Sequence, residues 1–136
     1  MEKTNCISNA MKILLKEQEI LSKRDKDSLF IKSKKMDTIP FILTAKNSST
    51  PFTAYSKSGE TPFFRIEEID NQTGCAKLSL LEGYDMDGTP AATCKDVYSL
   101  RKTKDCIVVV LNCFCVITPL PPELLNKPLP IIEPQK

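Results

Sequence analysis

Hydrophobic and polar residues follow two different periods along this chain. Between residues 4 and 24 the apolar positions recur at three- and four-residue spacing, which predicts one helix that Thr4 or Asn5 caps. The apolar stripe of this helix is narrow, and Gln18 interrupts it. A helix of this kind is marginal alone, so we expect it to pack on a partner surface.

From Ile39 onward the apolar period changes to two, which is typical of β-strands. Turn-rich pieces separate six predicted strands, at residues 40–45, 52–55, 63–69, 75–81, 97–101 and 106–117. The segments 63–69 and 75–81, joined by a five-residue turn, form the clearest hairpin. Strands and helices do not alternate along the chain, so we do not expect a parallel sheet. The predicted fold is therefore mainly β, a small antiparallel β-sandwich or barrel with an N-terminal helix and a proline-rich C-terminal tail.

Composition divides the chain into three predicted regions. Residues 1–37 comprise the N-terminal helix and a basic linker, residues 38–118 a β-rich assembly domain, and residues 119–136 a tail that holds six of the ten prolines. The tail cannot extend a sheet and favours polyproline geometry. The lysine-rich stretches between residues 23 and 35 contain few aromatic residues for base stacking, so we interpret them as a solvated helix end and linker.

The overall composition excludes several functions. The chain has 136 residues, enough for one domain with a real core, but it contains no histidine. Histidine-dependent nucleophiles and zinc-protease helices are therefore absent, and we expect no enzyme and no catalytic residue. A net charge of +2 is too small to indicate a nucleic-acid partner. The longest apolar run, residues 107–111, is too short to span a membrane, so no membrane partner is expected.

The six cysteines are the feature that most needs an explanation. The N-terminal sequence resembles no secretory signal, and cysteines of a protein made in a cytoplasm normally stay reduced, bind metal or perform redox chemistry. The chain has no CxxC pair, and a single Cys-Phe-Cys is weak support for zinc or for a thioredoxin-like activity. We therefore predict no metal site and no cofactor. A zinc or redox protein remains a hypothesis, which ranks behind the two hypotheses given at the end of this section.

Strand alternation assigns the thiols to faces. Segment 106–117 is apolar on both faces, which predicts burial on both sides, within the fold or against a neighbouring molecule. Cys113 and Cys115 share one face about 6.6 Å apart, at the outer limit for a disulfide, and core filling is the favoured interpretation for each. Cys75 shares its face with Lys77 and Ser79 and should be exposed. Cys94 in a loop and Cys6 at the helix start should also be exposed.

Residues 85–89 spell the Asp-x-Asp-Gly-Thr signature of haloacid-dehalogenase-type phosphatases. In that family the motif ends a buried parallel strand near the start of a longer chain. Here it lies within β-rich sequence and few residues follow it. We predict a hairpin turn, for which Asp and Gly supply the backbone angles.

Three segments together resemble a known family. They are the Phe-Phe-Arg strand at 63–69, the Gly-Cys-Ala-Lys-Leu-Ser-Leu-Leu segment at 74–81, and residues 100–117 with Cys106 followed by Cys-Phe-Cys. The chain resembles the CotY/CotZ/ExsY family of spore coat and exosporium proteins from about Thr38 to Leu120. The helix that opens with Cys6 fits more loosely.

The resemblance implies a structural protein that self-assembles into a layer hardened by intermolecular disulfides. The matching cross-link candidates are Cys6, Cys75, Cys94, Cys106, Cys113 and Cys115. It also implies synthesis in the mother-cell cytoplasm and deposition on the spore surface, as coat, crust or exosporium. Its partners would be further copies in a homo-oligomer or lattice and other spore coat or exosporium proteins. Family members often carry more cysteines. The alternative is therefore an adaptor that anchors other proteins or appendages to the spore surface with little self-association.

Overall fold

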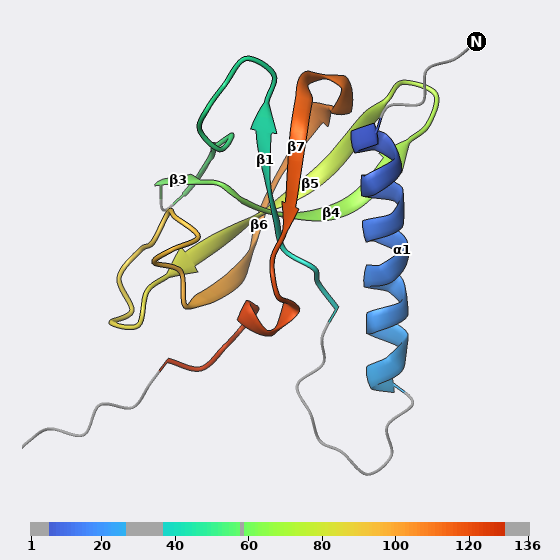
Figure 1. Ribbon diagram of the computed structural model, residues 1–136. Helices are drawn as coiled ribbons and strands as arrows, with labels where there is room; N and C mark the ends of the chain where they lie inside the picture. Colours follow the sequence, from blue (N-terminus) through green and yellow to red (C-terminus); the bar gives the residue numbers. More distant parts are fainter. Residues whose placement is uncertain (1–5, 27–36, 58, 130–136) are drawn as a thin grey trace, which may run out of the picture.

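Strands are the main regular structure of the described residues, and one helix lies beside them (Figure 1). The computed structural model describes residues 6–26, 37–57 and 59–129. The helices and strands in chain order are α1 (Cys6–Lys26), β1 (Phe41–Ala45), β2 (Ala54–Ser56), β3 (Gly59–Thr61), β4 (Phe63–Asp70), β5 (Cys75–Tyr84), β6 (Ser99–Val110), the 3-10 turn η1 (Leu111–Cys113), β7 (Phe114–Pro119) and the 3-10 turn η2 (Pro122–Leu124).

The strands form two antiparallel sheets. Five of them pair in the order β6-β5-β4-β1-β7, and β2 pairs with β3. The junction between β4 and β1 rests on one register pair, Phe41 with Phe64, so the sheet bends sharply there. Within the described residues, the edge strands β6 and β7 are not paired with each other. The prediction of a mainly β, antiparallel, sandwich-like fold is confirmed, and the sheet is not a closed barrel.

The predicted hairpin is present as β4 and β5. Gly74 takes a positive φ of 73°, and its N–H donates to the carbonyl of Asp70 to close the turn. The Asp70 carboxylate also accepts the N–H of Gln72. A bulge between Ile66 and Glu68 shifts the register of β4 against β5. The turn residues therefore set the hairpin, while the bulge adds a bend that no sequence period announces.

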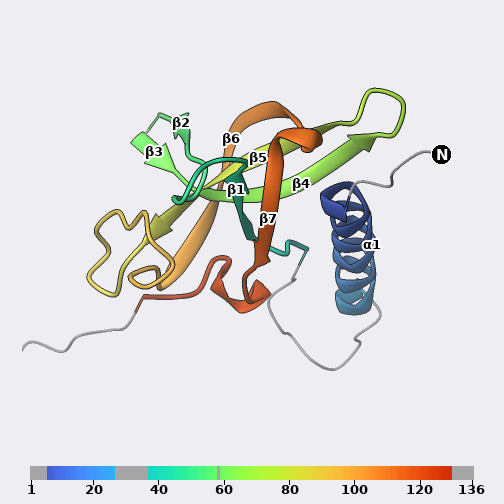
Figure 2. The ribbon, with the colours of Figure 1, turned by 45° about the horizontal axis from the view of Figure 1, so that its top comes forward.

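Helix α1 packs on the sheet beside β4 and β7 (Figures 1 and 2). Ile7, Met11 and Leu14 lie on its buried face, as the helical period requires. Gln18, which interrupts the stripe in sequence, is also buried. Its side-chain amide donates to the carbonyl of Ile66 at 3.0 Å, and its oxygen accepts the N–H of Ile39 at 3.1 Å. The proposed caps Thr4 and Asn5 lie outside the described residues.

The prediction of one continuous strand over 106–117 is wrong. The expected strand 97–101 instead runs on from Ser99 to Val110 as β6, and the turn η1 then separates it from β7. Leu111 and Phe114 are both buried at this corner, so the chain turns in order to place both side chains in the core. The corner carries the chain from one edge of the sheet to the other. The short strand β3 was not expected, because three residues are too few to show a period.

Two hydrophobic clusters fill the fold. The larger one lies between α1 and the sheet and includes contacts among the rings of Phe41, Phe52, Phe64 and Phe114. The smaller one is built on Phe63, Leu81 and Leu100, against which Leu124 and Leu125 pack. Residues 119–129 of the predicted tail therefore lie against the body. The lysine-rich linker at 27–36 and the end of the tail at 130–136 lie outside the described residues.

Residues 85–89 form the predicted turn. The Asp85 carboxylate accepts the N–H groups of Asp87 and Thr89 as well as the Thr89 hydroxyl, and Gly88 takes a positive φ of 84°. These hydrogen bonds, led by those from Thr89, hold the pKa of the Asp85 carboxyl below its usual value. The carboxylate is engaged in shaping its own turn.

Candidate cross-linking surface

The candidate site is a distributed set of thiols. All six cysteines are free; five are exposed and Cys75 is half-buried. Cys6 opens α1 and Cys94 lies in the loop between β5 and β6, whereas Cys113 ends η1. The other three lie on strands, Cys75 on β5, Cys106 on β6 and Cys115 on β7.

Within one copy, segment 106–117 is not buried on both sides, so the expectation of burial within the fold is wrong and burial against a neighbouring molecule stays a prediction. Val108 is 70% exposed, Val110 48% and Val116 46%. Along β6 the face with Val109 packs on the core, and at the corner that follows Leu111 and Phe114 are both buried. The prediction of core filling for Cys113 and Cys115 fails for the same reason, because η1 breaks the alternation between them. No described residue covers the other face, so its apolar side chains meet solvent.

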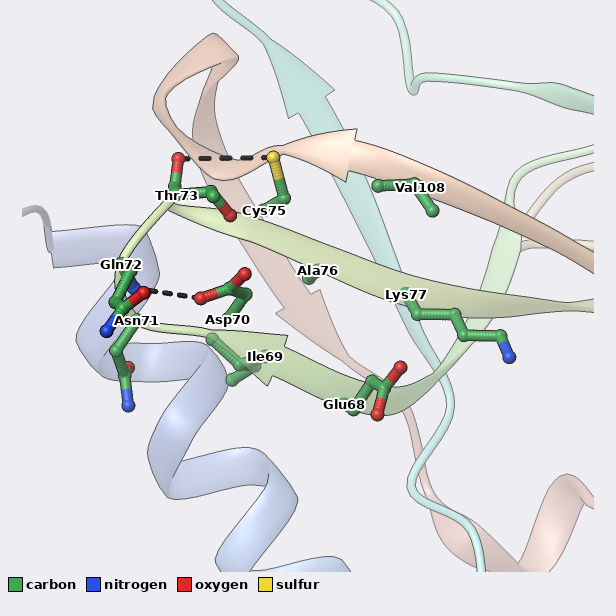
Figure 3. A pocket seen from close by; sticks show the side chains of 10 residues that line it. All are labelled: Glu68, Ile69, Asp70, Asn71, Gln72, Thr73, Cys75, Ala76, Lys77 and Val108. Atoms are coloured by element: carbon green, nitrogen blue, oxygen red, sulfur yellow. Dashed lines mark hydrogen bonds between the residues drawn. The ribbon is translucent and has the colours of Figure 1, made fainter.

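The outer face of β5 and β6 carries two of the thiols. Cys75 lies directly across from Val110, Lys77 from Val108, and Ser79 from Cys106. Figure 3 shows Cys75, Lys77 and Val108 on one side of these strands, where they line a shallow hollow of about 810 Å³ together with the β4–β5 turn. The prediction that Cys75 is accessible therefore holds in part. Its sulfur lies 3.9 Å from the carbonyl oxygen of Thr73, a weak contact that leaves it at the rim.

A polar network surrounds the other thiol of this face. The Cys106 sulfur lies 3.7 Å from the Ser79 hydroxyl, which donates to the Glu67 carboxylate at 2.6 Å. Arg65 forms an ion pair with the same carboxylate. Burial alone would raise the pKa of Glu67, but the hydrogen bonds from Arg65 and Ser79 outweigh it and hold the pKa below its usual value. Ser79, expected to be exposed, is buried beneath this network.

The remaining thiols differ in their surroundings. Partial desolvation raises the pKa of the Cys94 thiol, even though its side chain is exposed. The Cys115 sulfur lies 3.7 Å from the carbonyl oxygen of Ala45 on the neighbouring strand. The carbonyl of Cys113 accepts the N–H of Lys46, so the backbone of η1 is held beside the residue that follows β1. The last two thiols therefore lie near one end of the β1–β7 pair.

The arrangement does not favour bonds between the thiols of the outer face of one copy. Cys75 and the Cys106 partner Ser79 are four residues apart on β5, which is about 13 Å at strand spacing and beyond disulfide reach. Cys6 and the loop that carries Cys94 lie at opposite sides of the molecule (Figure 1). Within the described ranges, no three Cys, Asp or Glu side chains converge on a point that could hold a metal ion. What the arrangement offers chemically is a set of free thiols on several elements, five of them exposed.

The comparison with known families decides where such a surface belongs. The family model described as spore coat protein Z matches residues 1–122, nearly the whole chain. The chain belongs to the spore coat protein Z family. Membership gives it a structural role in the spore coat and places it at the spore surface. The resemblance read from the three sequence segments is thereby confirmed.

A curated member of the spore coat protein Z family is measurably similar. Spore coat protein Z of Bacillus subtilis (strain 168) is 42% identical over 69 residues, which cover 47% of this chain and 45% of that protein. The chain therefore matches less than half the length of this relative. No solved structure matches the chain. None of the described helices is long and apolar enough to cross a membrane.

The exposed valines and the network around Cys106 were missed in the sequence, although a signal for the valines was present. Lys77 is polar on the outer face of its strand, and antiparallel pairing transfers that exposure to its partner Val108. The register between β5 and β6 was the missing information. The contact of Ser79 with Glu67 has no such signal, because it depends on the bulge in β4.

Proposed function

We propose that this chain is a self-assembling subunit of the spore coat whose layer is hardened by disulfides between copies. One observation supports this above the others: six unbonded thiols, five of them exposed, are spread over different elements of one small body. Exposed unpaired thiols are normally avoided in soluble proteins. Thiols on several sides suit links to several neighbours.

The proposed chemistry takes place after assembly. In a reducing cytoplasm the thiols stay reduced and the subunits associate without covalent bonds. Once the spore surface is exposed to an oxidant such as dioxygen, two thiols lose two protons and two electrons to it and form one S–S bond. The partners in this scheme are further copies and other coat proteins that carry accessible thiols.

Non-reducing gel electrophoresis tests the proposal. We expect purified protein held in air to form a ladder of multimers, which dithiothreitol collapses to the monomer band. A variant with all six cysteines replaced by serine is the control and should give only the monomer band under both conditions. Electron microscopy with and without reductant then shows whether the multimers are layers. A clean monomer from oxidised wild-type protein would contradict the proposal and favour the adaptor with little self-association.

A further inference from the structure

The two edges of the five-stranded sheet differ in the elements that cover them. Helix α1 contacts β7 and lies beside it, so one edge is accompanied by a helix (Figures 1 and 2). At the other edge, the first part of β6 is covered by the segment after η2, where Leu125 bridges to Leu100 and the Asn126 N–H donates to the Leu100 carbonyl. Past a register shift near residues 102–106, no described residue pairs with the outer side of β6.

The open part of β6 has a defined set of unpaired backbone groups. The Leu111 N–H donates to the Gly74 carbonyl of the β5 turn, and pairing continues as Val109 with Ala76. In an antiparallel pair, the backbone N–H and C=O groups of every second residue point toward the partner strand. Here the odd-numbered residues of β6 direct these groups toward β5. The N–H and C=O groups of Cys106, Val108 and Val110 therefore point away from the sheet. Their side chains lie on the solvent-facing side.

This edge lacks the devices that normally block pairing with another chain. Natural edge strands carry charges, prolines or bulges, or they are covered. Between Cys106 and Val110 every residue is apolar, and the register shift ends before Cys106. Such an edge is complementary to another extended apolar segment with the same alternation. Residues 106–110 of a second copy meet this description when that copy runs antiparallel to the first.

We propose that two copies of this chain pair antiparallel through residues 106–110 of β6, with Val108 of each copy opposite Val108 of the other. This interface rests on the proposed self-assembly and supplies its first contact. Cys106 then lies opposite Val110 of the second copy, and the inner-face residues Ile107 and Val109 meet across the junction. A slip of two residues would place Val110 opposite Lys104 in one direction, or Cys106 opposite Asn112 in the other, which makes the central register the most apolar one.

The same geometry keeps the thiols apart at this interface. Cys75 lies beside Val110 and hence two strand spacings from Cys106 of the second copy, about 9.6 Å, which exceeds disulfide reach. The contact is therefore non-covalent and insensitive to reductant. Five residues a side bury less than the ~1,200 Å² of a stable interface, so we expect the dimer to form at high protein concentration.

Light scattering after size exclusion, with excess dithiothreitol, tests the interface apart from the disulfides. We expect a concentration-dependent dimer for wild type and for the variant with six serines. Val108→Lys should raise the dissociation constant by at least tenfold, because it places two lysines opposite each other. Val116→Lys is the matched control: Val116 is also an exposed valine on an edge strand, and its replacement should leave the dimer unchanged. Thermal melts of both variants verify folding.

Hydrogen exchange adds a readout that surface packing alone would not move. The amides of Cys106, Val108 and Val110 should be protected in the wild-type dimer and exchange rapidly in Val108→Lys. Equal effects of the two lysine variants, a monomer at every concentration in reductant, or rapid exchange of these amides in the dimer would each overturn the inference. A gel ladder without this dimer would support the disulfide links between copies and contradict the β6 interface. The dimer without a ladder would support the β6 interface and contradict the disulfide links.

Discussion

Cys94 shows that exposure and reactivity are separate properties of a thiol. Its side chain is exposed in the loop before β6, but neighbouring atoms desolvate the sulfur and raise its pKa. The thiolate is the form that attacks disulfides and alkylating agents. A cross-link through this residue should therefore form late, even though the position is accessible.

Alkylation of Cys94 at pH 8 is accordingly expected to be several-fold slower in the folded protein than in urea, because the fold lowers the thiolate fraction. The difference should shrink as the pH is raised further, because the thiol then ionises increasingly in both states. Iodoacetamide labelling followed by peptide mass spectrometry measures the rate, and a peptide of residues 90–98 calibrates the reagent. Equal rates in folded and unfolded protein at pH 8 would show that the local environment has no effect.

At the scale of elements, the helix and the hairpin show what a sequence period can and cannot specify. The period of α1 placed Ile7, Met11 and Leu14 on one face, and the turn residues at 70–74 placed the hairpin. By the helical period alone, Gln18 interrupts the apolar stripe, because the spacing of apolar residues carries no information on hydrogen-bond partners. In the structure this residue satisfies the carbonyl of Ile66, beside the bulge in β4, and the N–H of Ile39.

Gln18→Leu separates these two interpretations. If the stripe alone mattered, leucine would complete it and stabilise the protein. We expect instead a loss of about 2–4 kcal/mol in the free energy of unfolding, because two buried backbone groups lose their partners at ~1–3 kcal/mol each. Urea denaturation measures the change. Glu19→Leu, at the adjacent exposed position, is the control and should change stability by less than ~0.5 kcal/mol.

The accessibility of the thiols was predictable only where alternation could be read without knowing the neighbours. Cys6 and Cys94 are exposed as expected, whereas the accessibility of Cys113 and Cys115 depends on the corner at η1. That corner arises because Leu111 and Phe114 are both buried in the core. Such a requirement belongs to tertiary packing and leaves no periodic trace in the chain.

For the whole molecule, ionised carboxylates join the segment before β1 to the sheet. Asp37 accepts a hydrogen bond from Lys102 at 2.6 Å, and Arg65 donates to Thr38 at 2.8 Å while it pairs with Glu67. Burial opposes ionisation of Asp37, but the hydrogen bonds from Lys102 and Thr38 prevail and lower its pKa. The pKa of Glu67 is lowered in the same way.

These lowered pKa values make stability depend on acidity in one direction. Above the unfolded-state values, about 4 for carboxyl groups, both states are ionised and the contribution is fully present. As the pH falls through the folded-state values, protons bind and the contribution is lost. Urea midpoints should therefore hold from pH 7 to 5 and decline below about pH 4. Glu67→Gln should lower stability at pH 7 by about 1 kcal/mol and flatten the decline, whereas Glu68→Gln on the exposed surface should do neither.

The unequal edges of the sheet limit how this molecule can grow. A strand that pairs on one side only can join one neighbour through hydrogen bonds and then has nothing left to offer, so pairing of this kind stops at two. Extension in a plane would have to come from the sulfur atoms on the remaining sides. A coat built this way would consist of backbone-paired doublets joined by disulfides, and at high protein concentration reducing agents would take it apart into pairs rather than single chains.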